Sequence, residues 1–196
     1  MIVKKIFTLS LFLFFSIILF GQKNEFNLIQ LDSTWGQEVL RFPARNMNYT
    51  GVGEVRFPPK GWIKPEHDNF WSYTYAWSIN VDRKIPEKEL EIDLVKYFNS
   101  LNRIDMSDAD NKHYSSATVR KTKQNKSSAF YKGKVNIYDR FATKKMITLN
   151  VLIESYYCKN KKETNILFKF SPKGLKHKTW EMLKKIKLRN TLCDKL

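Results

Sequence analysis

The segment from Phe70 to Val81 constrains the fold more than any other part of the chain, because its side chains alternate in size without a break. Bulky apolar residues stand at Trp71, Tyr73, Tyr75, Trp77, Ile79 and Val81, with small or polar residues between them. A period of two is typical of a β-strand, whose successive side chains point to opposite faces of a sheet. We therefore predict a strand with one face in an aromatic core and a small-residue face suited to close packing by another element.

The remaining patterns predict an α+β fold in which helices cover an antiparallel sheet. A weak pattern indicates a short helix over residues 28–41, and Glu54–Phe57 is typical of a short strand. Pro86 opens a helix that ends near Asn102. Four strands and a closing helix are then predicted at Ser115–Lys123, Phe130–Phe141, Met146–Cys158, Thr164–Phe170 and Leu175–Leu188. The predicted order is ββ-α-ββββ-α, with Phe141 and Leu175 pointing inward.

The first 21 residues are typical of a secretory signal peptide. Lys4 and Lys5 precede an apolar run of 15 residues from Ile6 to Phe20, and a membrane-spanning helix needs about 20. Cleavage after Gly21 would leave residues 22–196 as a single domain, exported to the periplasm or the extracellular space. The alternative is an uncleaved segment 1–21 that serves as an N-terminal membrane anchor.

Export changes the interpretation of the two cysteines, Cys158 and Cys193. An even number of cysteines in an exported chain is compatible with a disulfide. Both residues stand at the ends of predicted elements and not on apolar faces. We expect them to be joined, and the alternative is a pair of free or buried thiols.

Charge is distributed unevenly along the chain, whose formal net charge is +16. Residues 112–196 hold 22 Lys and Arg against 5 Asp and Glu, whereas residues 23–111 hold 11 against 14. This asymmetry predicts a basic surface that attracts phosphate, sulfate or acidic lipid. Most of the cations are Lys, which is also typical of a solvated surface, since specific phosphate recognition favours Arg. An anionic surface or an envelope protein is the expected partner, and nucleic acid is not.

Two kinds of residue are candidates for a binding surface. Trp62 stands in a Gly- and Pro-rich turn, where an aromatic ring is often half exposed. The basic candidates come from the polar strand and the closing helix, and they are Arg120, Lys121, Lys123, Lys176, Lys184 and Lys187. We expect some of these cations to form one continuous positive face.

No pattern predicts a catalytic centre, a cofactor site or a metal site. The G-x-S-x-G, H-E-x-x-H and Walker lysine patterns do not occur in the sequence. Gly51-Val52-Gly53 is interpreted as a turn, and the acidic segment from Asp105 to Asn111 as a solvated loop. Glu54 and Glu154 lie on strand patterns, where we expect structural roles, with Glu154 pointing to water.

Three short passages resemble the Mog1/PsbP-like architecture, an antiparallel sheet covered by helices. They are Pro59-Lys60-Gly61-Trp62, the Glu-rich helix ending in Tyr97-Phe98, and the closing helix with Trp180 and Ile186. The resemblance covers the chain after about Gly53, and the passage Gly53–Trp77 also resembles exported bacterial proteins of unknown function. Members of the broader fold serve mainly in binding or assembly, so the resemblance implies a binding role.

Three functions are compatible with these observations. The first is an exported, non-enzymatic binding or scaffolding module of the cell envelope. The second is a small exported hydrolase with dispersed carboxylates or a Cys–His pair. The third is an electrostatic binder of anionic lipid or polysaccharide, which rests on the basic half of the chain. A basic or apolar surface patch would favour binding, and ionisable residues converging in a cleft would favour the hydrolase.

Overall fold

The computed structural model describes residues 27–42, 47–108 and 110–193, and the predicted signal peptide at 1–21 lies outside them. Strands dominate this described part. They are β1 (Ile29–Gln30), β2 (Gly36–Phe42), β3 (Gly51–Phe57), β4 (Tyr73–Ile79), β5 (Ser116–Gln124), β6 (Ser128–Tyr138), β7 (Met146–Cys158), β8 (Glu163–Ser171) and β9 (Lys187–Leu188). The helices are α1 (Glu87–Asn102) and α2 (Lys178–Lys185), with short 3-10 turns at η1 (Lys159–Lys161) and η2 (Asn190–Leu192).

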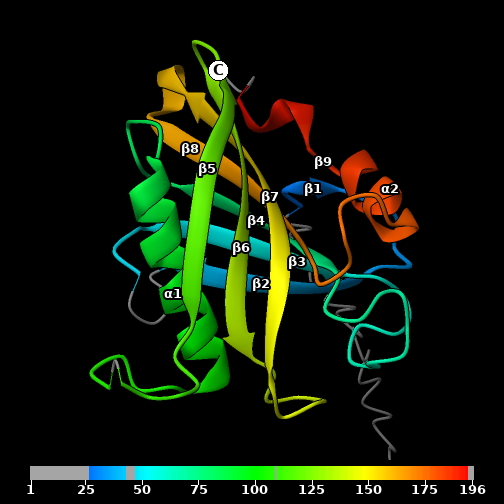
Figure 1. Cartoon of the computed structure of the whole chain (residues 1–196). Helices are drawn as coiled ribbons and strands as arrows, with labels where there is room; N and C mark the ends of the chain where they lie inside the picture. The colour runs from blue at the N-terminus through cyan, green and yellow to red at the C-terminus, as the bar shows by residue number, and fades with distance from the viewer. Residues whose placement is uncertain (1–26, 43–46, 109, 194–196) are drawn as a thin grey trace, which may run out of the picture.

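Seven of the strands form one sheet in the order β2-β3-β4-β8-β7-β6-β5, and β1 pairs separately with β9. Every neighbouring pair in the large sheet is antiparallel, which confirms the predicted antiparallel sheet. Figure 1 shows this sheet strongly coiled, with β2, β3 and β4 crossing behind β5, β6 and β7. In the same view α1 lies beside β5, and α2, β1 and β9 lie on the opposite side.

One face of the sheet packs against α1 and holds the main core. The predicted aromatic face is confirmed there, because Trp71, Tyr73, Tyr75 and Trp77 are at most 1% exposed. From α1, the side chains of Leu90, Leu94 and Phe98 are buried in the same core. The regular alternation of the sequence therefore becomes a continuous aromatic layer between sheet and helix.

The opposite face of the sheet divides into two halves. The covered half is the part of β3, β4, β7 and β8 under α2, β1 and β9, where Trp180 and Leu183 pack with Ala76 and Leu167. The small residues at 72, 74 and 76 are buried here, which confirms the predicted close approach of another element. The open half consists of β5, β6 and the adjoining part of β7, where Arg120 remains exposed.

The predicted helix over residues 28–41 is wrong, because this segment forms β1 and β2. All seven residues of β2 pair with β3, from Gly36 opposite Phe57 to Phe42 opposite Gly51. A weak helical pattern gives no apolar stripe to bury, whereas pairing satisfies the backbone along the whole segment.

The closing helix is shorter than expected, and the strand predicted at Phe130–Phe141 ends earlier than expected. α2 begins at Lys178 with His177 as its N-cap, and Ile186 then turns into extended backbone so that β9 can pair with β1. Leu175 consequently lies outside the helix and is 39% exposed. β6 ends at Tyr138, and Phe141 lies 43% exposed in the following turn.

The predicted α+β class is right only in its mixture of helix and antiparallel sheet. From residue 51 onward the elements follow the predicted order of two strands, a helix, four strands and a helix. The described chain is nevertheless mostly β, and the eight-residue α2 covers only half of its face. The sheet therefore leaves a large polar surface uncovered, and the candidate site lies on that surface.

Candidate functional site

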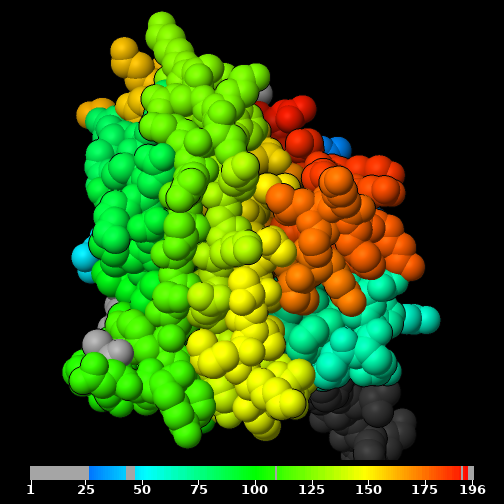
Figure 2. Space-filling view, viewed as in Figure 1, coloured from blue at the N-terminus to red at the C-terminus, as the bar shows by residue number. Residues whose placement is uncertain are grey.

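A groove of about 490 Å³ lies on the open half, between the strands and the loop that precedes α2. In Figure 2 it lies between the green and yellow surface of β5–β7 and the orange surface of the α2 region. Its lining combines cations with hydroxyl and amide groups and contains no carboxylate. The residues are Ser116, Thr118, Arg120, Lys132, Gly133, Lys134, Asn136, Asn150 and Leu175.

The pairing of β5, β6 and β7 brings these side chains together. Arg120 lies opposite Lys132, and Thr118 lies opposite Lys134, which in turn faces Asn150 of β7. Directly opposed residues on one face have Cβ atoms about 5 Å apart, and alternate residues along a strand are about 7 Å apart. Strand pairing therefore holds Arg120, Lys132 and Lys134 close together on one face of the sheet.

The loop between β8 and α2 forms one wall of the groove. The side-chain amide of Asn150 donates to the carbonyl of Lys173 at 3.0 Å, and the indole of Trp180 donates to the same carbonyl at 2.7 Å. Lys184 Nζ donates to the carbonyl of Leu175 at 3.5 Å. These contacts fix the loop against the sheet and bring a fourth cation, the ammonium of Lys184, to the rim of the groove.

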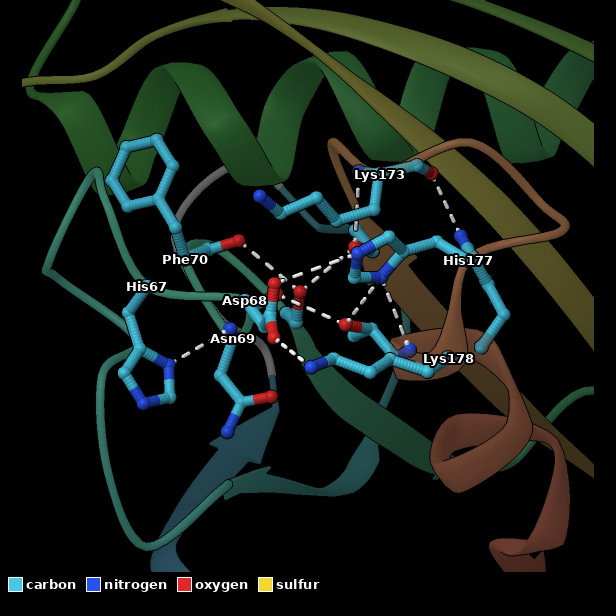
Figure 3. A network of polar contacts seen from close by, with 11 residues as sticks. His67, Asp68, Asn69, Phe70, Lys173, His177 and Lys178 are labelled. Carbon is cyan, nitrogen blue, oxygen red and sulfur yellow. Dashed lines mark hydrogen bonds and ion pairs between the residues drawn. The ribbon is translucent and has the colours of Figure 1, made fainter.

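A polar network holds this wall to the β3–β4 loop (Figure 3). Asp68 lies between His177 and Lys178, with its carboxylate oxygens 3.4 Å from His177 Nε2 and 2.6 Å from Lys178 Nζ. The hydrogen bond from Lys178 lowers the pKa of the Asp68 carboxyl below its ordinary value. The carboxylate in turn raises the pKa of Lys178. The start of α2 is thereby tied to a loop more than a hundred residues earlier in the chain.

Asp68, His177 and Thr179 stand in line like a catalytic triad, but their hydrogen bonds assign them a structural role. His177 Nδ1 accepts the backbone N–H of Thr179 at 3.2 Å as the helix cap. The hydroxyl of Thr179 donates to the carbonyl of Asp68 at 3.0 Å, and Thr179 is only 3% exposed. His177 Nδ1 also lies 3.0 Å from the Thr179 hydroxyl. Because this hydroxyl is buried, these contacts cap α2 and join it to the β3–β4 loop.

The covered half contains a buried cluster around Glu154, which the sequence wrongly predicts to point to water. Glu154 is 9% exposed, and its Oε1 lies 2.5 Å from Lys169 Nζ and 3.6 Å from Lys187 Nζ. Tyr156 donates to the second carboxylate oxygen at 3.0 Å. Burial lowers the pKa of Lys169 and raises the pKa of Tyr156 to about 12. The helix α2 and strand β9 exclude water from this carboxylate, and neither is visible in the local strand pattern.

A second buried pair anchors β1 to the sheet. Glu54 is fully buried, and its Oε1 lies 2.5 Å from Arg56 Nε. Its other oxygen accepts the backbone N–H groups of Leu28 and Ile29. These contacts give Glu54 the structural role that the sequence predicts.

The basic candidates predicted from the sequence are distributed over several places. Arg120 lines the groove, Lys176 follows Leu175 in its wall, and the ammonium of Lys184 reaches the same wall. Lys123 lies opposite Phe130 on the same side of the sheet. Lys187 instead contacts Glu154 and lines a smaller pocket of about 300 Å³ beside the disulfide.

Lys121 and Trp62 lie away from the groove. Lys121 Nζ is 3.9 Å from Glu87 of α1, on the other side of the sheet. A bulge in β5 between Lys121 and Lys123 separates these two neighbours. Trp62 is half-buried, with its ring 4.8 Å from that of Phe57 and 5.5 Å from that of Trp71. The predicted basic candidates therefore do not form one continuous positive face. Only some of them, such as Arg120 and Lys184, lie together at the groove.

Lys132 and Lys134 are the functional candidates that the sequence analysis did not name. They alternate on β6 with Tyr131 and Val135, which are buried in the main core. The same period of two that predicts the strand therefore also places both lysines on the opposite face.

The predicted pairing of Cys158 with Cys193 is found, with the two Cα atoms 5.3 Å apart. It joins the end of β7 to the chain just after η2. Among residues 27–42, 47–108 and 110–193, no group of three His, Cys, Asp or Glu side chains is arranged to hold a metal ion. None of the helices in these segments is long and apolar enough to cross a membrane.

Comparisons of the chain with protein-family models, with curated proteins and with solved structures give no match in any of the three. The chemistry of the groove therefore rests on its own residues and their geometry.

Proposed function

We propose that this protein is an exported, non-enzymatic binding module of the cell envelope and that its groove holds an anionic polysaccharide. The observation that carries the proposal is the presence of Arg120, Lys132 and Lys134 in one groove with no carboxylate among its lining residues. Sulfate or carboxylate groups on a polymer would meet these cations. The hydroxyl and amide groups of Thr118, Asn136 and others suit the hydroxyl groups of sugars.

Export is supported by the apolar run after Lys4 and Lys5 and by the disulfide between Cys158 and Cys193. The resemblance to the Mog1/PsbP-like architecture also stays a proposal. It is supported by the order of β3, β4, α1, β5–β8 and α2. A binding or assembly role is what that resemblance implies.

A glycoside hydrolase is less well supported. Such enzymes place two carboxyl groups on either side of the bond that is cleaved, and the groove lining offers none. Glu154, on the neighbouring covered half, is engaged by Lys169, Lys187 and Tyr156. Stacking of nucleic-acid bases is also not favoured, because no aromatic ring lines the groove.

Retention on immobilised dextran sulfate, with neutral dextran as the comparison, tests the proposal. We expect the protein to bind dextran sulfate at low salt and to elute as salt screens the exposed cations. The variant Lys132→Glu/Lys134→Glu should bind about tenfold more weakly, because two attractions become repulsions. The matched control Lys88→Glu/Lys112→Glu changes the net charge equally at exposed positions outside the groove. It should stay within about twofold of the wild type.

Two results would overturn the proposal. One is the absence of retention by the wild type at low salt. The other is an equal loss in both double variants, which would show that only the net charge matters.

A further inference from the structure

Two loops from distant parts of the chain meet at one end of the molecule. They are the β3–β4 loop over residues 58–72 and the β6–β7 turn over residues 139–145. The ring of Phe141 in the turn lies 5.9 Å from Trp62 and 5.8 Å from Trp71 in the loop. Figures 1 and 2 show both segments at the same end, with the turn at its tip.

Exposed apolar side chains gather at this end. Ile63 is 50% exposed, and Phe141 and Met146 are each 43% exposed. A single exposed apolar residue needs no explanation, whereas these three lie in the β3–β4 loop, in the β6–β7 turn and at the start of β7, at the same end of the molecule. Other exposed apolar residues, such as Val39 on β2 and Ile92 on α1, lie on separate elements.

The turn that carries Phe141 is held in one conformation. The buried carboxylate of Asp139 accepts backbone N–H groups from Phe141 at 3.0 Å, Ala142 at 3.1 Å and Thr143 at 2.7 Å. It also accepts the hydroxyl of Thr143 at 2.7 Å. The exposed ring is therefore presented on a rigid support, so little conformational freedom is lost when it is buried by a partner.

Cations surround the apolar tips. The guanidinium of Arg140 lies 5.7 Å from the centre of the Phe141 ring. The other cations are Lys60, Lys64, Lys144 and Lys145, all exposed, and the same segments contribute the exposed carboxylate of Glu66. Asp68, in the same loop, already pairs with Lys178. Exposed apolar side chains beside Lys and Arg are complementary to an anionic lipid bilayer, whose headgroups are negatively charged and whose interior is hydrocarbon.

We propose that this end of the protein docks on an anionic lipid bilayer. Phe141 and Ile63 enter the headgroup region, while Lys144, Lys145 and Lys64 contact lipid phosphates. A bilayer fits this end because its exposed apolar side chains lie in segments with five cations, Lys60, Lys64, Arg140, Lys144 and Lys145, against the single exposed carboxylate of Glu66. This surface is distinct from the groove of the proposed function, and the two can be tested separately.

Co-sedimentation with vesicles tests the proposal, using phosphatidylglycerol mixed with phosphatidylcholine against phosphatidylcholine alone. The exported protein should bind the mixed vesicles preferentially. Lys144→Glu/Lys145→Glu should weaken that binding about tenfold. The control Lys126→Glu/Lys162→Glu makes the same change of net charge at exposed positions beyond the opposite ends of β6 and β7, and it should stay within about twofold. An equal or larger loss in the control would overturn the proposal.

The apolar contribution needs its own pair of variants. Phe141→Ser/Ile63→Ser should weaken binding to the mixed vesicles about tenfold, whereas Val39→Ser/Ile92→Ser, at similarly exposed positions elsewhere, should leave it unchanged. A Phe141→Trp variant gives an independent readout, because brominated acyl chains should quench the new indole and should not quench one introduced by Ile92→Trp. Equal binding by both serine variants, or no difference in quenching, would contradict insertion of this end.

Discussion

The covered and open halves belong to the same side of one sheet, but their charged side chains differ in burial and in pairing. In the covered half, Lys169 pairs with Glu154 and Arg56 with Glu54, and all four side chains are at most 11% exposed. In the open half, the cations of the groove are exposed, and they form no ion pair with any residue that the structure describes.

The contrast is sharpest for Lys132 and Lys169, which stand in one row across the sheet, each opposite Leu152 of β7. A buried cation needs a partner from its own chain because desolvation is costly. An exposed cation has no such requirement, so its lack of a partner leaves it available to a ligand. The charges of the covered half thus serve the fold, and those of the open half are the ones that can serve binding.

The largest effect is expected when the buried member of this row is removed. Lys169→Ala leaves Glu154 buried without its closest partner and should lower the free energy of unfolding by about 3–5 kcal/mol. Lys132→Ala removes an exposed side chain and should change it by less than about 0.5 kcal/mol. Urea unfolding of both variants measures the difference. Similar stabilities for the two would remove the distinction between the halves.

The disulfide should contribute somewhat less, because it fastens only the end of the cover. Cys158 and Cys193 are 35 residues apart in sequence, and closing a loop of this size stabilises a protein by about 3–4 kcal/mol in the chain-entropy model. Cys158→Ser/Cys193→Ser should lose about that amount in urea unfolding. The reduced wild type is the matched control and should unfold together with the variant. A variant as stable as the oxidised wild type would contradict this role.

The smallest effect is expected from loosening the groove wall. Asp68→Asn removes the ion pair with Lys178 and should weaken retention on dextran sulfate about twofold. Asp105→Asn is the control, because Asp105 also has a lowered pKa but binds only Ser107 in a separate turn. An equal effect of both substitutions would show that the wall does not shape the groove.

The ion pair between Asp68 and Lys178 also predicts that the stability of the protein depends on pH. The pKa of Asp68 is lowered in the folded protein, so its pairing with Lys178 is present above the ordinary Asp value of about 4 and is lost as the pH falls below it. The free energy of unfolding of the wild type, measured in urea, should decrease in that acidic range. The Asp68→Asn variant should show a smaller decrease, and identical pH profiles would contradict the assignment.

Regular alternation made part of this molecule predictable from sequence. The bulky residues from Tyr73 to Ile79 specify both a strand and the face that is buried, whereas Trp71, predicted in the same strand, lies in the turn before it. Applied to β6, the same rule places Lys132 and Lys134 on the open side once Tyr131 and Val135 are assigned to the core. The groove cations were therefore within reach of sequence reasoning, although only Arg120 was named.

Long-range contacts account for what could not be predicted. β1 and β9 have two residues each, too few for any period, and they pair only because residues 29 and 188 meet in space. Glu154 alternates like a solvent-facing residue, and its burial depends on α2 and β9. The bulge between Lys121 and Lys123 moves Lys123 to the open side of the sheet, and no local pattern marks it.

Lysine acetylation footprinting with and without dextran sulfate tests the central claim most directly, because mass spectrometry reports each lysine separately. Lys132 and Lys134 should be protected by the polysaccharide, with weaker protection of Lys176 and Lys184 at the wall. Lys88 and Lys112, exposed elsewhere, should react equally in both conditions, and the buried Lys169 should react slowly in both. Protection spread evenly over all exposed lysines, or protection of Lys88 and Lys112 without Lys132 and Lys134, would contradict the assignment of the open half as the binding surface.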